Sequence, residues 1–171
     1  VGDHQTIDFD PGPAAETMEG KFRPGHFIGM SEVVYRLLRI TSPDSLFMGQ
    51  KDFQQFSIIR KLITDFQMPI QLVMCPTVRE ANGLAMSSRN VRLSPEARDK
   101  AGVIFNILTS GKMLFEQKTP AKYVQDIALD ALRKVNFDPE YFEVVNGYTL
   151  EPVETLQDAD QIVACCAVKV E

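Results

Sequence analysis

The stretch SLFMGQKDFQQFSIIRKLITDFQMPIQLVMC, residues 45–75, decides the fold of this chain. It opens with a short apolar run, SLFMG, and continues with a segment from about residue 52 to residue 66 whose apolar residues recur at helical spacing. Met68-Pro69 ends that segment, and the apolar run IQLVMC follows as a buried strand. A strand, a helix and a strand with short connections form a βαβ unit, so the stretch predicts an α/β fold with a parallel sheet.

The residues before this unit predict a loop and then a helix. Residues 1–25 are rich in glycine, proline and acidic residues, which is typical of a loop with at most a short helix. A one-faced helix is predicted after them, because apolar residues recur at the i, i+3, i+4, i+7 spacing: Met30, Val33, Val34, Leu37 and Leu38. This helix should end before Pro43.

The composition of the sequence changes after Cys75. The segment PTVREANGLAMSSRNVRLSPE is rich in small and polar residues and has no sustained helical or strand periodicity. Long ordered connections of this kind are often functional or lie between domains. We therefore expect a domain boundary near Pro76, with residues 1–76 in one domain and residues 77–171 in the other.

The second domain is predicted to be a small α+β domain. Ser94-Pro95 is typical of an N-cap followed by proline at the first helical position, and it predicts a helix to about residue 117. Thr119-Pro120 repeats this pattern before a second helix with an apolar stripe. The runs YFEVVNG and QIVACCAVKV then predict two strands.

Composition narrows the classes of partner. The 171 residues carry a formal net charge of −5, which argues against broad nucleic-acid binding because such binding needs a basic surface. No apolar run approaches membrane-spanning length. Cys75, Cys165 and Cys166 lie in apolar runs without metal-ligand spacing, so we interpret them as small buried residues of a cytoplasmic protein and predict no metal site. Because the chain starts with Val1 rather than methionine, we expect a fragment of a longer protein.

Gly49 falls where the first strand ends and the next helix begins. In α/β sheets this carboxyl edge is where ligands bind, and the N–H groups and dipole of a helix N-terminus suit phosphate. Lys51 adds a mobile positive charge, and Asp52 either caps the helix or binds a ribose hydroxyl. The alternative has about equal weight: Gly49 is a turn, Asp52 is a cap, and the lysine and glutamines are solvated.

Two adjacent glutamines follow. Successive helical residues are turned by about 100°, so Gln54 and Gln55 cannot both face the crevice at Gly49. Gln55 follows Lys51 by four residues and shares its face of the helix. We therefore expect Gln55 to be the one that faces the crevice.

Two further segments offer groups for an anion. In LAMSSRN, residues 84–90, Ser87 and Ser88 supply hydroxyl and N–H groups, and Arg89 supplies a bidentate fork. Such a loop can close over a triphosphate and stabilise charge on the leaving pyrophosphate, although a solvated serine-rich turn is favoured by these residues alone. In RPGHF, His26 is a general acid or base, an anion ligand, or, by default, a loop histidine bonded to the backbone.

Three motifs, in this order, resemble the pantothenate synthetase (pantoate–β-alanine ligase) family: EGKFRPGHFIGM, FMGQKDFQQ and PTVREANGLAMSSRN. The family belongs to the adenylate-forming nucleotidylyl transferases. The resemblance runs from about Met18 to the C-terminus and is strongest over residues 23–93. It implies the remainder of a Rossmann-like nucleotidylyl transferase domain, followed by a small α+β C-terminal domain that acts as a lid.

The resemblance also implies a reaction. In this family ATP, accompanied by Mg²⁺, activates the pantoate carboxylate as pantoyl-adenylate and pyrophosphate leaves. The amine of β-alanine then displaces AMP and gives pantothenate, a coenzyme A precursor. The implied partners are pantoate, β-alanine and a second copy of the whole enzyme, with neither nucleic acid nor membrane.

The family's site residues fall on matching positions of this sequence. ATP contacts are implied for nine residues: Gly49, Gln50, Lys51, Asp52, Val78, Met86, Ser87, Ser88 and Arg89. Among them, the resemblance implies a catalytic role for four: Lys51, Ser87, Ser88 and Arg89. Gln55 matches the pantoate-binding glutamine, and Arg23 and His26 match a segment at the periphery of the active site. Gln50 stands where many members carry glutamate.

One family motif has no match here. The MGxLHxGH-type motif, whose histidines steady the triphosphate, is absent from these 171 residues. We therefore expect the C-terminal part of the enzyme, inactive by itself. Two alternatives stay open, namely another nucleotidylyl transferase with a different acceptor, and a non-catalytic nucleotide-binding or dimerisation module.

Overall fold

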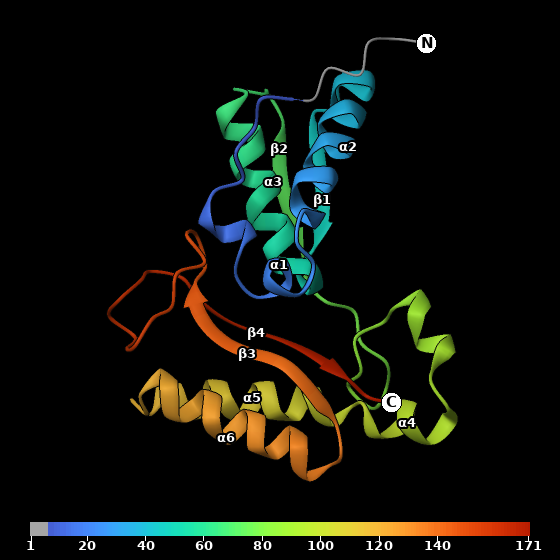
Figure 1. The fold of residues 1–171 in the computed structure, drawn as a ribbon, viewed down its shortest axis with the longest axis vertical. Helices are drawn as coiled ribbons and strands as arrows, with labels where there is room; N and C mark the ends of the chain where they lie inside the picture. The colour runs from blue at the N-terminus through green and yellow to red at the C-terminus, as the bar shows by residue number, and fades with distance from the viewer. Residues whose placement is uncertain (1–6) are drawn as a thin grey trace. The chain divides into compact units, whose positions relative to one another are not determined.

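The computed structural model describes residues 7–171, which form two compact units. The first unit ends at Pro76, and the second begins at Thr77. Figure 1 shows the first unit in blue to green and the second in green to red. Among residues 7–171, no helix combines the length and the apolar character needed to cross a membrane.

The first unit is built around two parallel strands. Its elements are η1 (Pro13–Ala15), α1 (Glu19–Phe22), α2 (His26–Thr41), β1 (Ser45–Gly49), η2 (Gln50–Asp52), α3 (Phe53–Asp65) and β2 (Gln71–Cys75). Strands β1 and β2 pair in parallel, with Gly49 opposite Cys75. The βαβ unit predicted from the sequence therefore forms, and α2 ends two residues before Pro43, as predicted.

The core of the first unit lies between its helices and one face of the strands. Leu38 of α2 meets Ile59 and Leu62 of α3, and both α3 residues are completely buried. Leu46 and Met48 of β1 pack against this cluster. Figure 1 shows α2, α3 and the two strands running together. Because strand side chains alternate, Leu46 and Met48 share the buried face of β1, and the strand ends at Gly49.

The second unit places two helices on an antiparallel pair of strands. Its elements are η3 (Ser88–Arg92), α4 (Pro95–Lys100), α5 (Val103–Glu116), α6 (Ala121–Lys134), β3 (Asp138–Asn146) and β4 (Ile162–Lys169). Figure 1 shows α5 and α6 side by side beneath the strands. Val124 and Ala128 of α6 meet Phe142 and Val144 of β3 in the core. This is the small α+β arrangement that the sequence predicts.

The predicted single helix from residue 95 to residue 117 is wrong, because α4 ends at Lys100 and α5 begins at Val103. The Asn82 side chain donates to the carbonyl oxygens of Arg98 and Asp99, at 2.9 Å and 3.1 Å. Gly102 lies so close to Asn82 that a Cβ on Gly102 would be 2.1 Å from the Asn82 carbonyl oxygen. These contacts with Asn82, about twenty residues earlier in the chain, therefore interrupt the helix between α4 and α5.

The predicted start of the next helix also differs by one residue. Helix α6 begins at Ala121, and Pro120 rather than Thr119 occupies the N-cap position, without a capping hydrogen bond from a side chain in the described chain. The N–H of Ala121 instead donates to the carbonyl oxygen of Glu154 at 3.1 Å. A tertiary contact thus takes the place of the expected cap.

Candidate functional site

Gly49 ends β1 with an open backbone. Its φ of −71° and ψ of 136° are extended values that any residue adopts. Apart from Gly49 and its two chain neighbours, no residue of the described chain has an atom within 4 Å of the position that a Cβ would occupy. The fold therefore does not require glycine here, and its effect is to leave the backbone accessible at the carboxyl end of the strand.

Lys51 and Asp52 stand beside this backbone on the surface. Lys51 Nζ lies 3.1 Å from Asp52 Oδ1, and the two side chains are 44% and 65% exposed. Asp52 occupies the N-cap position of α3, but its side chain makes no capping bond within residues 7–171. Surface ion pairs contribute little to stability, so both charges can turn to a ligand at low cost.

Gln54 and Gln55 have different environments. Gln54 is 7% exposed, and its Oε1 accepts from the N–H of Glu19 at 3.1 Å. Its Nε2 donates to the carbonyl oxygens of Ala14 and Thr17 at 2.7 Å and 2.8 Å. Gln55 is half-buried, and its amide makes no hydrogen bond within the described chain. Gln54 thus ties the segment at residues 14–19 to α3, whereas the Gln55 amide is not engaged within residues 7–171.

In the second unit, residues 78–86 form a short antiparallel hairpin. The N–H of Met86 donates to the carbonyl oxygen of Val78 at 2.9 Å, and Arg79 pairs with Ala85. Gly83, with a φ of +93°, makes the turn. Val78 and Met86 stand opposite each other, so their side chains share one face, where they are 67% and 58% exposed. The hairpin thus presents a small apolar surface next to the MSSR segment.

The serines and the arginine of that segment follow directly. The Ser87 hydroxyl accepts from the N–H of Arg89 at 3.2 Å and caps η3. Ser88 and Arg89 are exposed, and the Arg89 guanidinium has no ion pair within residues 7–171. A guanidinium in this state can form bidentate bonds to phosphate without losing another partner.

The structure adds a polar cluster that the sequence did not reveal. Glu80 Oε1 accepts from Asn90 Nδ2 at 2.8 Å, and Glu80 Oε2 accepts from Arg98 Nε at 2.9 Å. Asn90 Nδ2 also donates to the carbonyl oxygen of Ala85 at 3.0 Å. The hydrogen bonds from Arg98 and then from Asn90 lower the pKa of Glu80 below its usual value. Both carboxylate oxygens are therefore engaged beside the MSSR segment.

Arg23 and His26 lie at the surface of the first unit. Arg23 forms an ion pair with Glu19, one helical turn earlier. His26 begins α2, and its exposed ring packs against Phe27 with centroids 5.0 Å apart. The structure therefore gives His26 an aromatic neighbour, whereas the default sequence interpretation was a backbone hydrogen bond.

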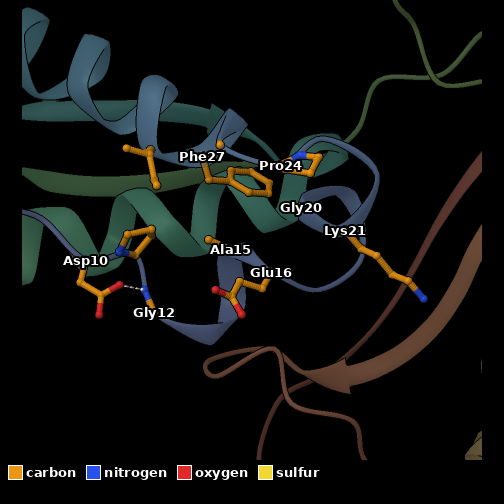
Figure 2. Close-up of a pocket in the computed structure, with 11 residues that line it drawn as sticks. Asp10, Gly12, Ala15, Glu16, Gly20, Lys21, Pro24 and Phe27 are labelled. Carbon is orange, nitrogen blue, oxygen red and sulfur yellow. Dashed lines mark hydrogen bonds between the residues drawn. The ribbon is translucent and has the colours of Figure 1, made fainter.

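An open pocket of about 380 Å³ lies beside this segment. Figure 2 shows its walls, formed mainly by η1, α1 and the start of α2: Asp10, Gly12, Glu16, Lys21, Pro24 and Phe27 are among them. The Asp10 carboxylate accepts from the Gly12 N–H at 2.8 Å, and the Lys21 side chain extends outward. None of the residues predicted to bind nucleotide or pantoate lines this pocket.

A metal site or a reactive thiol would be a further source of chemistry within the described residues. Within residues 7–171, no group of three or more His, Cys, Asp and Glu side chains could hold a metal ion. Burial raises the pKa of Cys165 to about 12 and that of Cys166 to about 11. Both are therefore protonated thiols at neutral pH and poor nucleophiles.

Comparisons with known proteins agree on one family. Residues 5–171 match the model of the pantoate-beta-alanine ligase family. The chain is 41% identical to the pantothenate synthetase of Porphyromonas gingivalis over 160 residues, which cover 94% of this chain and 57% of that protein. It is 39% identical to that of Bacteroides fragilis over 166 residues, covering 95% and 58%.

Solved structures show the same similarity. The pantothenate synthetase of Thermus thermophilus matches with a TM-score of 0.84 and 35% identity, covering 94% of this chain and 58% of that one. The pantoate–β-alanine ligase of Francisella tularensis, complexed with β-γ ATP and β-alanine, matches with a TM-score of 0.64 and 29% identity, covering 90% and 55%. The predicted family and fold class are thereby confirmed, and the chain spans a little under 60% of the length of these relatives.

Proposed function

The chain belongs to the pantoate–β-alanine ligase family, and we propose that the whole protein condenses pantoate with β-alanine to form pantothenate. In the first step, a pantoate carboxylate oxygen attacks the α-phosphorus of ATP, the bond to the bridging oxygen breaks, and pyrophosphate leaves. In the second step, the amine of β-alanine attacks the acyl carbon of pantoyl-adenylate, and AMP leaves.

The observation that carries this proposal is the accessible turn at the carboxyl end of β1. The backbone of Gly49 is exposed there, although packing within the fold would also accommodate a larger residue. We assign the backbones of Gly49 and Gln50 and the cation of Lys51 to the phosphates, in keeping with the anion preference of a helix N-terminus. The Asp52 carboxylate is assigned to a ribose hydroxyl.

The second unit supplies the other nucleotide contacts in this proposal. The apolar face of Val78 and Met86 suits a purine ring. Ser87 and Ser88 donate hydroxyl hydrogen bonds to the triphosphate. Arg89, which has no ion pair within the described chain, stabilises the negative charge that grows on the pyrophosphate leaving group.

Gln55 is assigned to pantoate, because its amide lies on α3 one turn beyond Lys51 and has no partner among residues 7–171. The Nε2 group can donate to the pantoate carboxylate and hold it for attack. Arg23 and His26 are placed at the periphery of the active site. Mg²⁺ would arrive with the ATP phosphates, since this ion is commonly held by phosphates and water rather than by a protein cage.

Three broader predictions accompany this function. The whole enzyme is expected to be a cytoplasmic homodimer, and the three cysteines, none of which forms a disulfide, fit a reducing compartment. The MGxLHxGH-type motif is absent from these 171 residues, so we propose that they form no pantothenate by themselves. Pantothenate production by the purified chain at the rate of a full-length relative would contradict this.

Titration of ATP into the purified chain, followed by calorimetry, tests the nucleotide site. We expect Lys51→Ala to weaken ATP binding by at least about tenfold, since one charge-assisted contact is worth about 1.5–3 kcal/mol. Lys112→Ala is the matched control, because Lys112 also forms a surface ion pair, with Glu116. ATP binding that ignores Lys51 would instead favour a nucleotide-binding module with its site elsewhere.

The acceptor requires a second measurement. In the presence of ATP, pantoate should bind the chain, and Gln55→Ala should weaken the binding of pantoate. A different hydroxy acid that binds more tightly than pantoate would favour another nucleotidylyl transferase.

A further inference from the structure

Glu80 joins three separate segments of the second unit. It lies on the hairpin, it receives a hydrogen bond from Asn90 in η3, and it receives another from Arg98 in α4. Each carboxylate oxygen has its own donor, at 2.8 Å and 2.9 Å. The Glu80 side chain is only 19% exposed, so solvent screens these bonds less than those of most surface ion pairs.

Asn90 closes the loop that carries Met86, Ser87, Ser88 and Arg89. Its two Nδ2 hydrogens go to Glu80 and to the carbonyl oxygen of Ala85, so the residue just after the loop is tied to the residue just before it. Asn90 is 8% exposed and uses its full donor capacity in these two bonds. The path of the loop is therefore fixed at both ends by one buried amide.

The charges are divided in a way that favours an anion at the loop. Arg98 pairs with Glu80 and offsets its negative charge, which would otherwise repel phosphate. Arg89, in the loop itself, forms no ion pair within the described residues and keeps its full charge for a ligand. Glu80, Asn90 and Arg98 thus hold the loop in place, and none of them pairs with the Arg89 guanidinium.

We propose that Glu80 is a positioning residue, which acts through Asn90 to hold residues 86–89 in the conformation that receives the triphosphate. The proposal rests on the proposed function of that loop in ATP binding. Fixing a loop before binding improves affinity because less conformational entropy is lost when the ligand arrives. Glu80 itself does not touch the nucleotide in this arrangement.

The test compares Glu80→Ala, Glu80→Gln and Arg89→Ala by ATP titration and by hydrogen exchange of the backbone amides. Glu80→Ala should weaken ATP binding by about five- to tenfold, as expected for the loss of one or two hydrogen bonds, and should speed exchange at residues 85–90. Glu80→Gln can still accept from Asn90 and should recover most of the affinity. Glu140→Ala is the matched control, because Glu140 is 15% exposed and pairs with Lys169 at 3.2 Å.

The outcomes separate the two proposals. If Arg89→Ala weakens ATP binding while Glu80→Ala changes neither affinity nor exchange, the positioning role is wrong and the phosphate loop stands. If Arg89→Ala leaves ATP binding unchanged, the phosphate site is wrong. Exchange measured without ATP then decides whether Glu80 holds the loop, and unchanged exchange in Glu80→Ala would overturn the proposal.

Discussion

The N–H of Met86 donates to the carbonyl oxygen of Val78 at 2.9 Å, and this bond places two residues from opposite ends of a hairpin on one exposed face. If this face receives the purine ring, Val78→Ala and Met86→Ala should each weaken ATP binding by about fivefold. Each removes roughly 40 Å² of apolar contact, worth about 1 kcal/mol. The measurement is calorimetric titration with ATP.

Inorganic tripolyphosphate provides the control for that prediction, because it carries the phosphates without the base. Its affinity should be the same in Val78→Ala, Met86→Ala and the unaltered chain. Equal losses for ATP and tripolyphosphate would mean that the substitutions disturb the loop rather than the base contact.

Gly49→Ala should separate binding from folding. The backbone is extended and, apart from Gly49 and its two chain neighbours, no residue of 7–171 has an atom within 4 Å of the added Cβ, so the melting temperature should not fall. A methyl group beside the phosphates costs about 1–3 kcal/mol of overpacking, so ATP affinity should fall at least about fivefold. Thermal unfolding and ATP titration of the same preparation check both parts.

Gly20→Ala is the contrasting variant. A Cβ at residue 20 would lie 1.8 Å from the carbonyl oxygen of Ala15, so this substitution should lower the melting temperature clearly. If Gly49→Ala lowered the melting temperature as much as Gly20→Ala, the inference that the backbone of Gly49 is accessible would be wrong.

Alanine substitutions of the adjacent Gln54 and Gln55 should differ in whether they affect stability or pantoate binding. Gln54→Ala removes three hydrogen bonds to the loop at residues 14–19, and we expect it to reduce the free energy of unfolding by about 1–3 kcal/mol. Gln55→Ala breaks no hydrogen bond within residues 7–171 and should leave that energy unchanged while weakening pantoate binding. Urea unfolding monitored by circular dichroism compares the two, and equal effects would contradict the division of roles.

Low pH should loosen the second unit through Glu80. The hydrogen bonds from Arg98 and Asn90 lower the folded-state pKa of Glu80 below the ordinary value of 4.5. The stabilisation from this carboxylate is therefore complete above about pH 4.5 and is lost as the pH falls through the folded pKa. Amide exchange at residues 85–90, measured from pH 6 to pH 3, should rise relative to the rest of the unit.

Glu80→Gln is the control for the pH dependence, because it removes the titrating group and keeps an acceptor for Asn90. Taken relative to the rest of the unit, its exchange at residues 85–90 should change less between pH 6 and pH 3 than that of the unaltered chain. The same pH dependence in both proteins would exclude Glu80 as its source.

Local patterns predicted the parts of the fold that depend on periodicity. The apolar run of β1 and the helical spacing in α3 reflect burial against one core, so both are visible in the sequence. The break between α4 and α5 depends on Asn82, about twenty residues before Gly102, and no helical pattern records that contact. Sequence analysis therefore found the elements but missed an interruption imposed by tertiary structure.

The candidate site shows the same division. The helical angle between Gln54 and Gln55 predicted that only one would face the crevice at Gly49, and the structure gives the other three backbone partners more than thirty residues away. The cluster of Glu80, Asn90 and Arg98 joins residues separated by ten and eighteen positions. Hydrogen bonds between residues this far apart leave no periodic pattern in the sequence, so only the folded structure reveals them.

Asn82 has a mechanical consequence for the hairpin. Its Oδ1 accepts from the N–H of Leu84 in the turn, while its Nδ2 holds the carbonyl oxygens of Arg98 and Asp99. Together with the Glu80–Arg98 pair, these bonds tie the hairpin to α4. If the hairpin moves when a nucleotide binds, α4 should therefore move with it, and a hinge for that movement should lie outside these two segments.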